Sequence, residues 1–561
     1  MKKFLTLLTV LCTVCVGTKA QTGDMPQWIH DLQTMNPGVI DSIQVYPAPK
    51  EPHTTTTYTI YYNQPLQHSF TDGEHFRLRA LLTVPNDTDP TTAVNHVYCS
   101  GYSIMDVFLK VPDFVHNLMT ASPNEIAKRY NANLIMIEHR YFQKSAPDNC
   151  WKRLDHLTAE EAAQDFHGLF EALKKVLKGK WVMSGVSKGG TTTLLQHTFF
   201  PADMDIFVPY SAPFFDTDRD TEMTRYWYTH GWSKEWRDFF DNIRKESLRR
   251  HQEIFNIFYR MNYPGKSEGA RDTCYGDFIA RVALCGFDEH AYGDTLIMRK
   301  WLNNNDSILA AHHMEYGDTV YAYIAEKETI SLDSFPKWLA TLRRLSQTNE
   351  VMPPRHKVTR GRAPFGITEK EWWSADSIDA NAYPYQAKRE LGYYDFDFSL
   401  IFDNDTEKAA EWNKYWREHY GCACDFFSPC YASLSFSRSL YDRTMEATRN
   451  ATRPIVLIYG YDDTWTGAAV KDEYINGRNV RKFILPAQNH NVSFSSNTDR
   501  EQCDAIREIL DGVLSTPTDM AGIARATEGS VAKSRKVFSN GRMYILRDGK
   551  RFTVTGMEVA E

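Results

Sequence analysis

Residues 185–189 read Gly-Val-Ser-Lys-Gly, a G-x-S-x-G pattern with a serine at its centre. Residues 180–184 (KWVMS) before it have the composition of a short buried strand, and residues 190–200 (GTTTLLQHTFF) after it that of a helix with an apolar face. A serine on such a sharp strand-to-helix turn presents its hydroxyl above the sheet, and the glycines leave space that a side chain would fill. We therefore predict that Ser187 is a nucleophile. A chance match of this short pattern is the alternative, which the flanking elements disfavour.

Strand-like and helix-like segments alternate on both sides of this motif. The predicted strands are residues 76–84, 95–99, 133–138, 180–184, 203–208, 454–460 and 481–485, and the predicted helices are residues 124–130, 160–177, 190–200 and 504–513. Alternation of this kind predicts an α/β protein with a mostly parallel sheet and helices on both faces. Together with the serine turn, it indicates the α/β-hydrolase fold.

A long segment interrupts the alternation. Residues 216–450 are rich in charged, aromatic and Trp-containing helical patterns and contain few strand signals. We interpret them as a helical cap inserted into one hydrolase domain, whose two parts are residues 21–215 and 451–513. A polar linker and a small β-hairpin around an Asp-Gly turn are predicted in residues 514–561.

The N-terminus has the three parts of a signal peptide. Two lysines at positions 2–3 precede an apolar run over residues 4–17, and Ala20 provides a small residue after which cleavage is expected. The run is too short to span a bilayer comfortably, and no later run reaches that length, so we expect no transmembrane segment in the mature chain. The expected location is periplasmic, cell-surface or secreted. Lipidation at Cys12 or Cys15 is the alternative, disfavoured because neither follows a small residue.

Composition excludes some classes of partner. The formal net charge of −7 argues against a nucleic-acid partner, which favours a basic surface. Eight of the ten cysteines lie beyond residue 20, and in an exported chain they permit disulfides whose pairing the sequence leaves open. Cys422, Cys424 and Cys430, with only His419 nearby, match no recognised zinc spacing, so no metal site is expected.

A serine hydroxyl needs a base, and the base needs a carboxylate to orient it. In this fold the order along the chain is serine, acid, histidine, with the last two on loops after late strands. His490 is the only histidine beyond His419 and follows the strand at 481–485. Asp462 and Asp463 both follow the strand at 454–460, and either is a candidate for the acid.

Two backbone N–H groups are expected to bind the oxyanion. One belongs to Lys188, directly after the serine, and the other to the loop after the strand at 95–99, where Tyr102 is the candidate. An ordinary glycine turn is the alternative for that loop.

Several motifs now occur together along residues 70–510. They are EHRYF at 138–142, KW at 180–181 before GVSKGG at 185–190, PADMD at 201–205 with VPYSAP at 208–213, YQA at 385–387 with ELGY at 390–393, and YG at 459–460 with Asp463 and Trp465. This set resembles the S37 serine peptidases, the prolyl tri/tetrapeptidyl aminopeptidase group, which are similar to the S28 family of lysosomal prolyl carboxypeptidase and dipeptidyl peptidase II. The resemblance favours Asp463 as the acid. Thr464 stands where the family usually has proline, which changes the loop more than the role of Asp463.

The resemblance implies a serine aminopeptidase that removes short peptides, with tripeptides as the expected product and often after proline, from a free N-terminus, and the signal peptide implies that it is exported. No metal or organic cofactor is expected. An exopeptidase holds the substrate ammonium with carboxylate or carbonyl groups. The resemblance makes Glu390 and Gln386 candidates for this role. Glu138 and Arg140 are further candidates, with a structural pair as the alternative. Two other functions stay open: an esterase or lipase on the same scaffold, and a surface binding protein without activity.

Overall fold

The computed structural model describes two compact units, Met1–Leu514 and Ser515–Glu561. The residues described are 25–46, 54–70, 73–104, 125–230, parts of 244–255, 271–283, 378–402, 405–421, 434–515 and the strand residues within 535–559. The predicted signal peptide, with Cys12 and Cys15, the cysteine group at 422–430 and most of the predicted linker lie outside these residues. No helix in the described ranges is long and apolar enough to cross a membrane.

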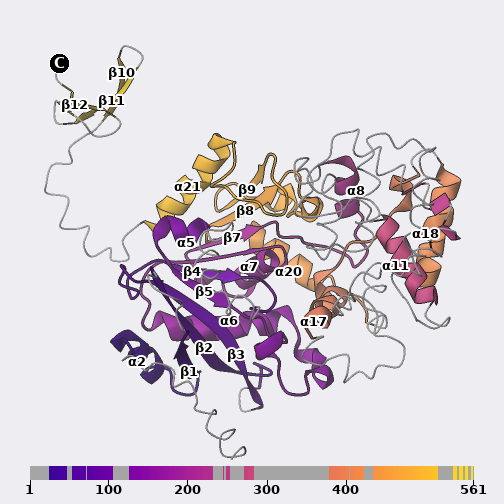
Figure 1. Ribbon diagram of the computed structural model, residues 1–561, viewed down its shortest axis with the longest axis horizontal. Helices are drawn as coiled ribbons and strands as arrows, with labels where there is room; N and C mark the ends of the chain where they lie inside the picture. The colour runs from indigo at the N-terminus through magenta and orange to yellow at the C-terminus, as the bar shows by residue number, and fades with distance from the viewer. Residues whose placement is uncertain are drawn as a thin grey trace, which may run out of the picture. The chain divides into compact units, whose positions relative to one another are not determined.

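The first unit is built on a nine-stranded sheet with the order β1-β2-β3-β5-β4-β6-β7-β8-β9. Its strands are β1 (Ile40–Val45), β2 (Thr55–Pro65), β3 (His75–Pro85), β4 (Asn95–Cys99), β5 (Asn133–Ile137), β6 (Trp181–Val186), β7 (Ile206–Tyr210), β8 (Ile455–Gly460) and β9 (Val480–Leu485). From β5 to β9 all neighbours are parallel, whereas β1, β2 and β3 pair antiparallel. This mostly parallel sheet, with a serine turn after a central strand, is the predicted α/β-hydrolase fold (Figure 1).

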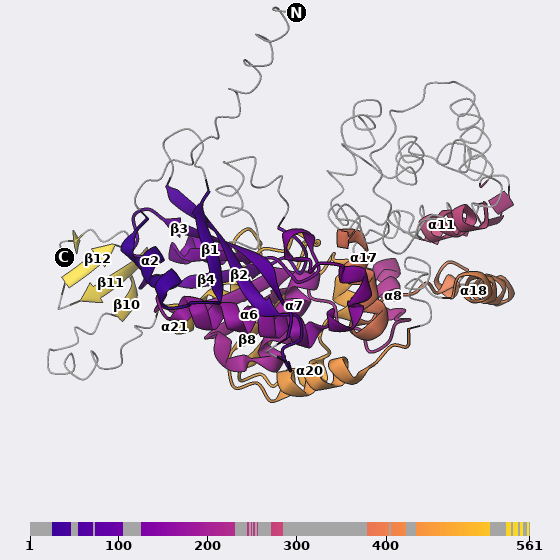
Figure 2. The ribbon, with the colours of Figure 1, turned by 90° about the horizontal axis from the view of Figure 1, so that it is seen from below.

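Helices cover both faces of the sheet. Helices α6 (Ala159–Lys174), α7 (Lys188–Phe199) and α20 (Ser439–Arg449) contribute to one buried apolar cluster, and α5 (Glu125–Tyr130) and α21 (Arg500–Leu514) to the other (Figures 1 and 2). Successive residues of a strand point to opposite faces, and β8 divides accordingly. Ile455, Leu457 and Tyr459 join the first cluster, whereas Val456 and Ile458 join the second. A strand buried on both faces is therefore a continuous apolar run.

Local sequence explains how the long helix α6 begins and packs. Thr158 accepts a hydrogen bond from the N–H of Glu161, which caps the N-terminus. Phe166, Leu169, Phe170 and Leu173 recur at helical spacing and are fully buried in the first cluster. The apolar face that the sequence predicted is the face that packs on the sheet.

Between β7 and β8 the described elements are helical. They are α8 (Glu222–Thr229), α11 (Arg271–Ala283), α17 (Ile378–Gln386), η7 (Ala387–Leu391), η8 (Phe398–Leu400), α18 (Thr406–Tyr420) and α20. An isolated bridge between Asp220 and Tyr394 joins the start of this segment to its later part.

The second unit is a four-stranded antiparallel sheet of β10 (Arg535–Ser539), β11 (Arg542–Arg547), β12 (Lys550–Thr553) and β13 (Glu558–Val559). Strands β11 and β12 form the small hairpin that the sequence predicted. The sheet has two further strands, one on each side, that the prediction did not include.

Candidate active site

Ser187 lies at the turn between β6 and α7 with φ 58° and ψ −127°. These dihedrals are rare for a residue with a side chain and mark a strained backbone. The N–H of Ser187 donates to the carbonyl of Tyr210, 3.0 Å away, which holds the turn against β7. A Cβ atom on Gly189 would lie 2.0 Å from the carbonyl oxygen of Cys99, so no side chain fits at this position. The motif thus forms the sharp turn that its sequence predicted.

His490 and Asp463 lie in contact. Nδ1 of His490 is 3.0 Å from Oδ2 of Asp463, and both side chains are buried. The other oxygen of Asp463 accepts the N–H of Trp465, 3.1 Å away, which fixes the carboxylate at the start of a 3-10 helix, η10 (Thr464–Ala468). An imidazole whose Nδ1 is held by a carboxylate leaves Nε2 as the proton acceptor.

Asp462, the other acid candidate, is arranged differently. Its backbone N–H donates to the carbonyl of Gln488, so it helps to join the loop after β8 to the loop after β9. Burial raises the pKa of its carboxyl group to about 6. The structure brings Asp463, and not Asp462, to His490.

The parallel strands place the loops that follow β6, β8 and β9 at the same end of the sheet. Ser187, Asp463 and His490 follow β6, β8 and β9, which run parallel, so all three lie beyond the carboxyl ends of their strands. Within the described residues, the Ser187 hydroxyl makes no hydrogen bond to His490. In unliganded enzymes such bonds are often long and shorten only when substrate binds.

The loop after β4 approaches the serine turn closely. Gly101 has a φ of +78°, and a Cβ atom on it would lie 2.8 Å from the backbone nitrogen of Gly189. The N–H of Tyr102, one predicted oxyanion donor, points to the hydroxyl of Ser100 at 3.1 Å. Lys188, the other predicted donor, is the first residue of α7, and N–H groups at this position have no acceptor inside their own helix.

The side chain of Lys188 is buried behind this loop. Its ammonium donates to the carbonyl of Gly101 and lies 5.3 to 5.8 Å from the ring centroids of Tyr102, Phe142 and Tyr383. Burial lowers the pKa of the Lys188 ammonium from 10.5 to about 7. A buried lysine is costly, so its contact with the loop after β4 makes the Lys188 side chain a candidate functional group that sequence reasoning missed. The sequence feature that could have revealed this role is a lysine directly after the predicted nucleophile, Ser187.

Gln386 at the end of α17 and Glu390 in η7 lie near Lys188. Glu390 accepts the N–H of Ala159 at the start of α6, 2.8 Å away, and burial raises the pKa of its carboxyl group to about 7. Gln386 lines a small cavity together with Lys188 and His139, and its buried amide oxygen has no hydrogen-bond partner among the described residues. Both residues therefore offer an acceptor beside the serine turn.

Glu138 and Arg140 are engaged elsewhere in the protein and do not pair with each other. Glu138 binds Arg79 at 2.5 Å and also accepts from the backbone N–H of Ile104 and the hydroxyl of Ser145. Arg140 makes two hydrogen bonds to Asp165, at 2.6 and 2.8 Å, and further bonds to backbone carbonyls. Both side chains are fully buried. These contacts favour the structural role that the sequence left open.

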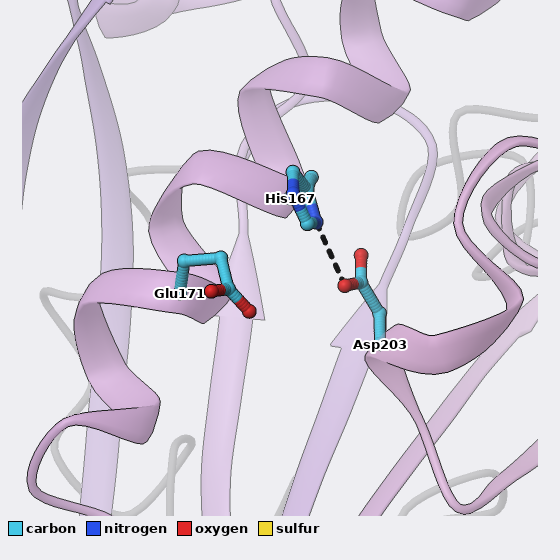
Figure 3. Close-up of side chains that lie close together, drawn as sticks. All are labelled: His167, Glu171 and Asp203. Carbon is cyan, nitrogen blue, oxygen red and sulfur yellow. Dashed lines mark hydrogen bonds and ion pairs between the residues drawn. The ribbon is translucent and has the colours of Figure 1, made fainter.

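One cluster in the described ranges has the side chains of a metal site. His167 and Glu171 on α6 face Asp203, and a hydrogen bond of 2.8 Å joins His167 to Asp203 (Figure 3). The ammonium of Lys174, however, lies 3.8 Å from Asp203 and 3.9 Å from Glu171. Because the Lys174 ammonium lies between the two carboxylates and His167 is hydrogen-bonded to Asp203, these groups already have partners within the protein, and we assign no metal to this cluster.

The chain matches a known family and a characterised relative. The model of the family described as PS-10 peptidase S37 matches residues 45–261, which contain Ser187, Lys188 and Tyr102. Over 238 residues the chain is 29% identical to the prolyl tri/tetrapeptidyl aminopeptidase of Streptomyces mobaraensis, covering 42% of this chain and 46% of that protein. The chain thus spans about half the length of this curated relative.

Solved structures with a likeness to this chain include two hydrolases. Proline iminopeptidase of Mycobacterium smegmatis is 11% identical, with a TM-score of 0.32, and the match covers 86% of this chain and all of that one. The peroxisomal α/β-hydrolase of Saccharomyces cerevisiae is 10% identical, with a TM-score of 0.31, and the match covers 88% of this chain and all of that one. The region that the family model matches contains Ser187, so this part of the chain is similar to the S37 family of serine peptidases.

Proposed function

We propose that this protein is an exported serine aminopeptidase that releases short peptides from the free N-terminus of peptide substrates. The observation that carries the proposal is the hydrogen bond of 3.0 Å between His490 and Asp463, at the same edge of the sheet as the serine turn. The name of the Streptomyces relative supports a tripeptide or tetrapeptide product and a preference for proline before the cut.

In the proposed reaction, Ser187 Oγ attacks the carbonyl carbon of the scissile bond while its proton passes to Nε2 of His490. Asp463 keeps the imidazole oriented and stabilises its charged form. The amine product leaves with the proton from His490, and water then hydrolyses the acyl-enzyme with His490 again acting as base. The released acyl part is the N-terminal peptide.

The N–H groups of Lys188 and Tyr102 are the proposed donors to the oxyanion. Since the N–H of Tyr102 points to the Ser100 hydroxyl in this structure, the substrate oxygen would replace that hydroxyl as acceptor. The Lys188 ammonium, bound to the Gly101 carbonyl, fixes the backbone just before Tyr102.

The proposed ammonium site consists of Glu390 and Gln386. Glu390 is held at the N-terminus of α6, and Gln386 presents an amide oxygen without a partner in the described residues. A substrate ammonium would satisfy that oxygen and favour the ionised form of Glu390. Free N-terminal peptides would then bind better than N-acetylated ones.

Two measurements test the proposal. A fluorophosphonate should label the wild type at Ser187 and should not label Ser187→Ala, and absence of labelling in the wild type would refute the serine mechanism. Mass spectrometry of products from a peptide mixture should show tripeptides or tetrapeptides from free N-termini only. Cleavage of simple esters without peptide release would instead identify an esterase.

A further inference from the structure

Glu125 is a buried carboxylate outside the proposed catalytic residues. It is the first residue of α5 and is 7% exposed. Four neutral groups donate to it. Oε1 accepts from the Tyr210 hydroxyl at 3.0 Å and the Phe494 N–H at 3.2 Å, and Oε2 accepts from the Ser493 hydroxyl at 2.7 Å and the Ser495 N–H at 2.8 Å. The side chain of Glu125 thus joins α5 to β7 and to residues 493–495.

The donors belong to the segments that carry the nucleophile and the base. Residues 493–495 directly follow His490 on the loop after β9. Tyr210 ends β7, and its carbonyl accepts the N–H of Ser187 at 3.0 Å. A continuous path of hydrogen bonds therefore runs from the serine turn through Tyr210 and Glu125 to the histidine loop.

The histidine loop has other contacts that close it on itself. The N–H of Ser493 donates to the side chain of Gln488, and Asn497 donates to the carbonyl of Pro486. These contacts set the internal shape of the loop, whereas the four bonds to Glu125 set its place relative to α5 and β7.

We propose that Glu125 is a positioning residue that holds the His490 loop in register with the serine turn. The inference rests on the proposed function, because it concerns the proton transfer between Ser187 and His490. Glu125→Gln replaces one carboxylate oxygen by an NH₂ group, which is a hydrogen-bond donor. Each carboxylate oxygen of Glu125 accepts one backbone N–H of the loop, so the NH₂ group would face a donor, and we expect the loop to move. A displacement of about 1 Å at a catalytic group can lower a rate about 100-fold.

The test compares Glu125→Gln with wild type, using the rate constant and the final stoichiometry of fluorophosphonate labelling together with kcat and KM. We expect the labelling rate constant and kcat to fall on the order of 10- to 100-fold, with KM and the final stoichiometry unchanged. Tyr210→Phe, which removes one donor of the four, should have a smaller effect in the same direction. A purely structural role predicts a lower stoichiometry and an unchanged rate constant in the folded fraction, and that result would overturn the inference.

Asp511→Asn is the matched control. Asp511 on α21 accepts hydrogen bonds from Arg129 and Tyr130, so this variant loosens α5 without touching the histidine loop. A labelling rate equal to that of Glu125→Gln would show that general loosening of α5 explains the effect, against the inference. Hydrogen exchange of residues 487–497 should be faster in Glu125→Gln than in Asp511→Asn, and equal exchange in the two variants would also overturn the inference.

The failure of this inference and the failure of the proposed function give different results. A wild type that is not labelled refutes the proposed function. A labelled wild type, with Glu125→Gln labelled at the same rate, refutes only the role of Glu125.

Discussion

Two neighbouring aspartates of the same loop have different surroundings, and this difference allows a test at the scale of a single residue. Asp463 is buried and bonded to His490 and to the Trp465 N–H, whereas Asp462 contacts the next loop through its backbone. Asp463→Asn should lower kcat about 1,000- to 10,000-fold, because an amide favours the wrong tautomer of the histidine. Asp462→Asn should change kcat less than about tenfold, because its side chain lies outside that hydrogen bond.

Steady-state kinetics of both variants on one peptide substrate gives the comparison. Circular dichroism is needed beside it, because Asp463 also caps η10 and its replacement can loosen that turn. If Asp462→Asn were the more damaging variant, the acid would have been assigned to the wrong residue.

The pKa of Glu390 makes a second prediction at this scale. Burial raises the pKa of this carboxyl group to about 7, so it is mostly neutral at pH 6 and mostly ionised at pH 8. If the ionised form binds the substrate ammonium, KM for free N-terminal peptides should fall about five- to tenfold as the pH rises from about 6 to about 7.5. The range stops there because the substrate amine itself loses its proton near pH 8.

Glu390→Gln should raise KM and remove this pH dependence. The rate of fluorophosphonate labelling needs no ammonium site, so its pH profile should be the same in wild type and variant. Lys188 titrates in the same range, because burial lowers the pKa of its ammonium to about 7, and Lys188→Met separates its contribution. A KM that depends on pH equally in Glu390→Gln and wild type would contradict the assignment.

Some site residues could be identified from the sequence alone, and others could not. Ser187 has a local motif, and His490 is identified because it is the only histidine beyond His419 and follows a late strand, but neither signal specifies geometry. The choice between Asp462 and Asp463 needed a resemblance, since both follow the same strand. Glu125 was beyond reach, because an acidic residue at the start of a helix is common and only the folded chain brings four donors to it.

Among the elements, the turn η10 contains Thr464, the position at which the family that the sequence resembles usually has proline. Thr464 is its first residue, where proline is well tolerated, and its buried hydroxyl has no partner among the described residues. The preceding Asp463 has φ −90° and ψ 122°, which is the conformation that a following proline requires. Thr464→Pro should therefore stabilise the protein by about 0.4–1 kcal/mol, because it restricts the unfolded chain and removes an unsatisfied hydroxyl.

Urea unfolding of Thr464→Pro and of Thr464→Ala separates the two causes, since alanine removes the hydroxyl, together with the γ-methyl group, without restricting the backbone. The kcat of Thr464→Pro should remain within about twofold of wild type if the family proline and this threonine hold the loop alike. A destabilised Thr464→Pro would mean that the backbone N–H of residue 464 has a partner that proline removes.

Elements differ in how well the sequence predicts them. Strands β7 and β8 are buried on both faces and are therefore continuous apolar runs, which the sequence analysis located within three residues. Strand β2 was missed although Tyr58, Ile60 and Tyr62 are buried, because three threonines precede them and Thr59 and Tyr61 lie between them, which dilutes the apolar signal. The antiparallel edge formed by β1 and β2 was absent from the sequence prediction, whereas β3 was predicted as residues 76–84.

At the scale of the whole molecule, the chain divides at the end of α21. Leu510 and Leu514 are buried in the second apolar cluster of the hydrolase unit, and the second unit begins at Ser515. A chain that ends at residue 514 retains every buried residue of that cluster. It should therefore unfold at the temperature of the full-length protein and keep its kcat/KM.

A chain that ends at residue 509 is the matched control, because it lacks both leucines. Loss of a buried leucine costs about 2–5 kcal/mol, so this shorter chain should unfold at a temperature several degrees lower or fail to accumulate. Thermal unfolding followed by circular dichroism, with kinetics on the same samples, compares the three chains. If ending the chain at residue 514 lowers its stability as much as ending it at 509, the tail contributes to the fold of the first unit. If both shorter chains match the full-length protein, the final turns of α21 contribute little to the core that the buried leucines define.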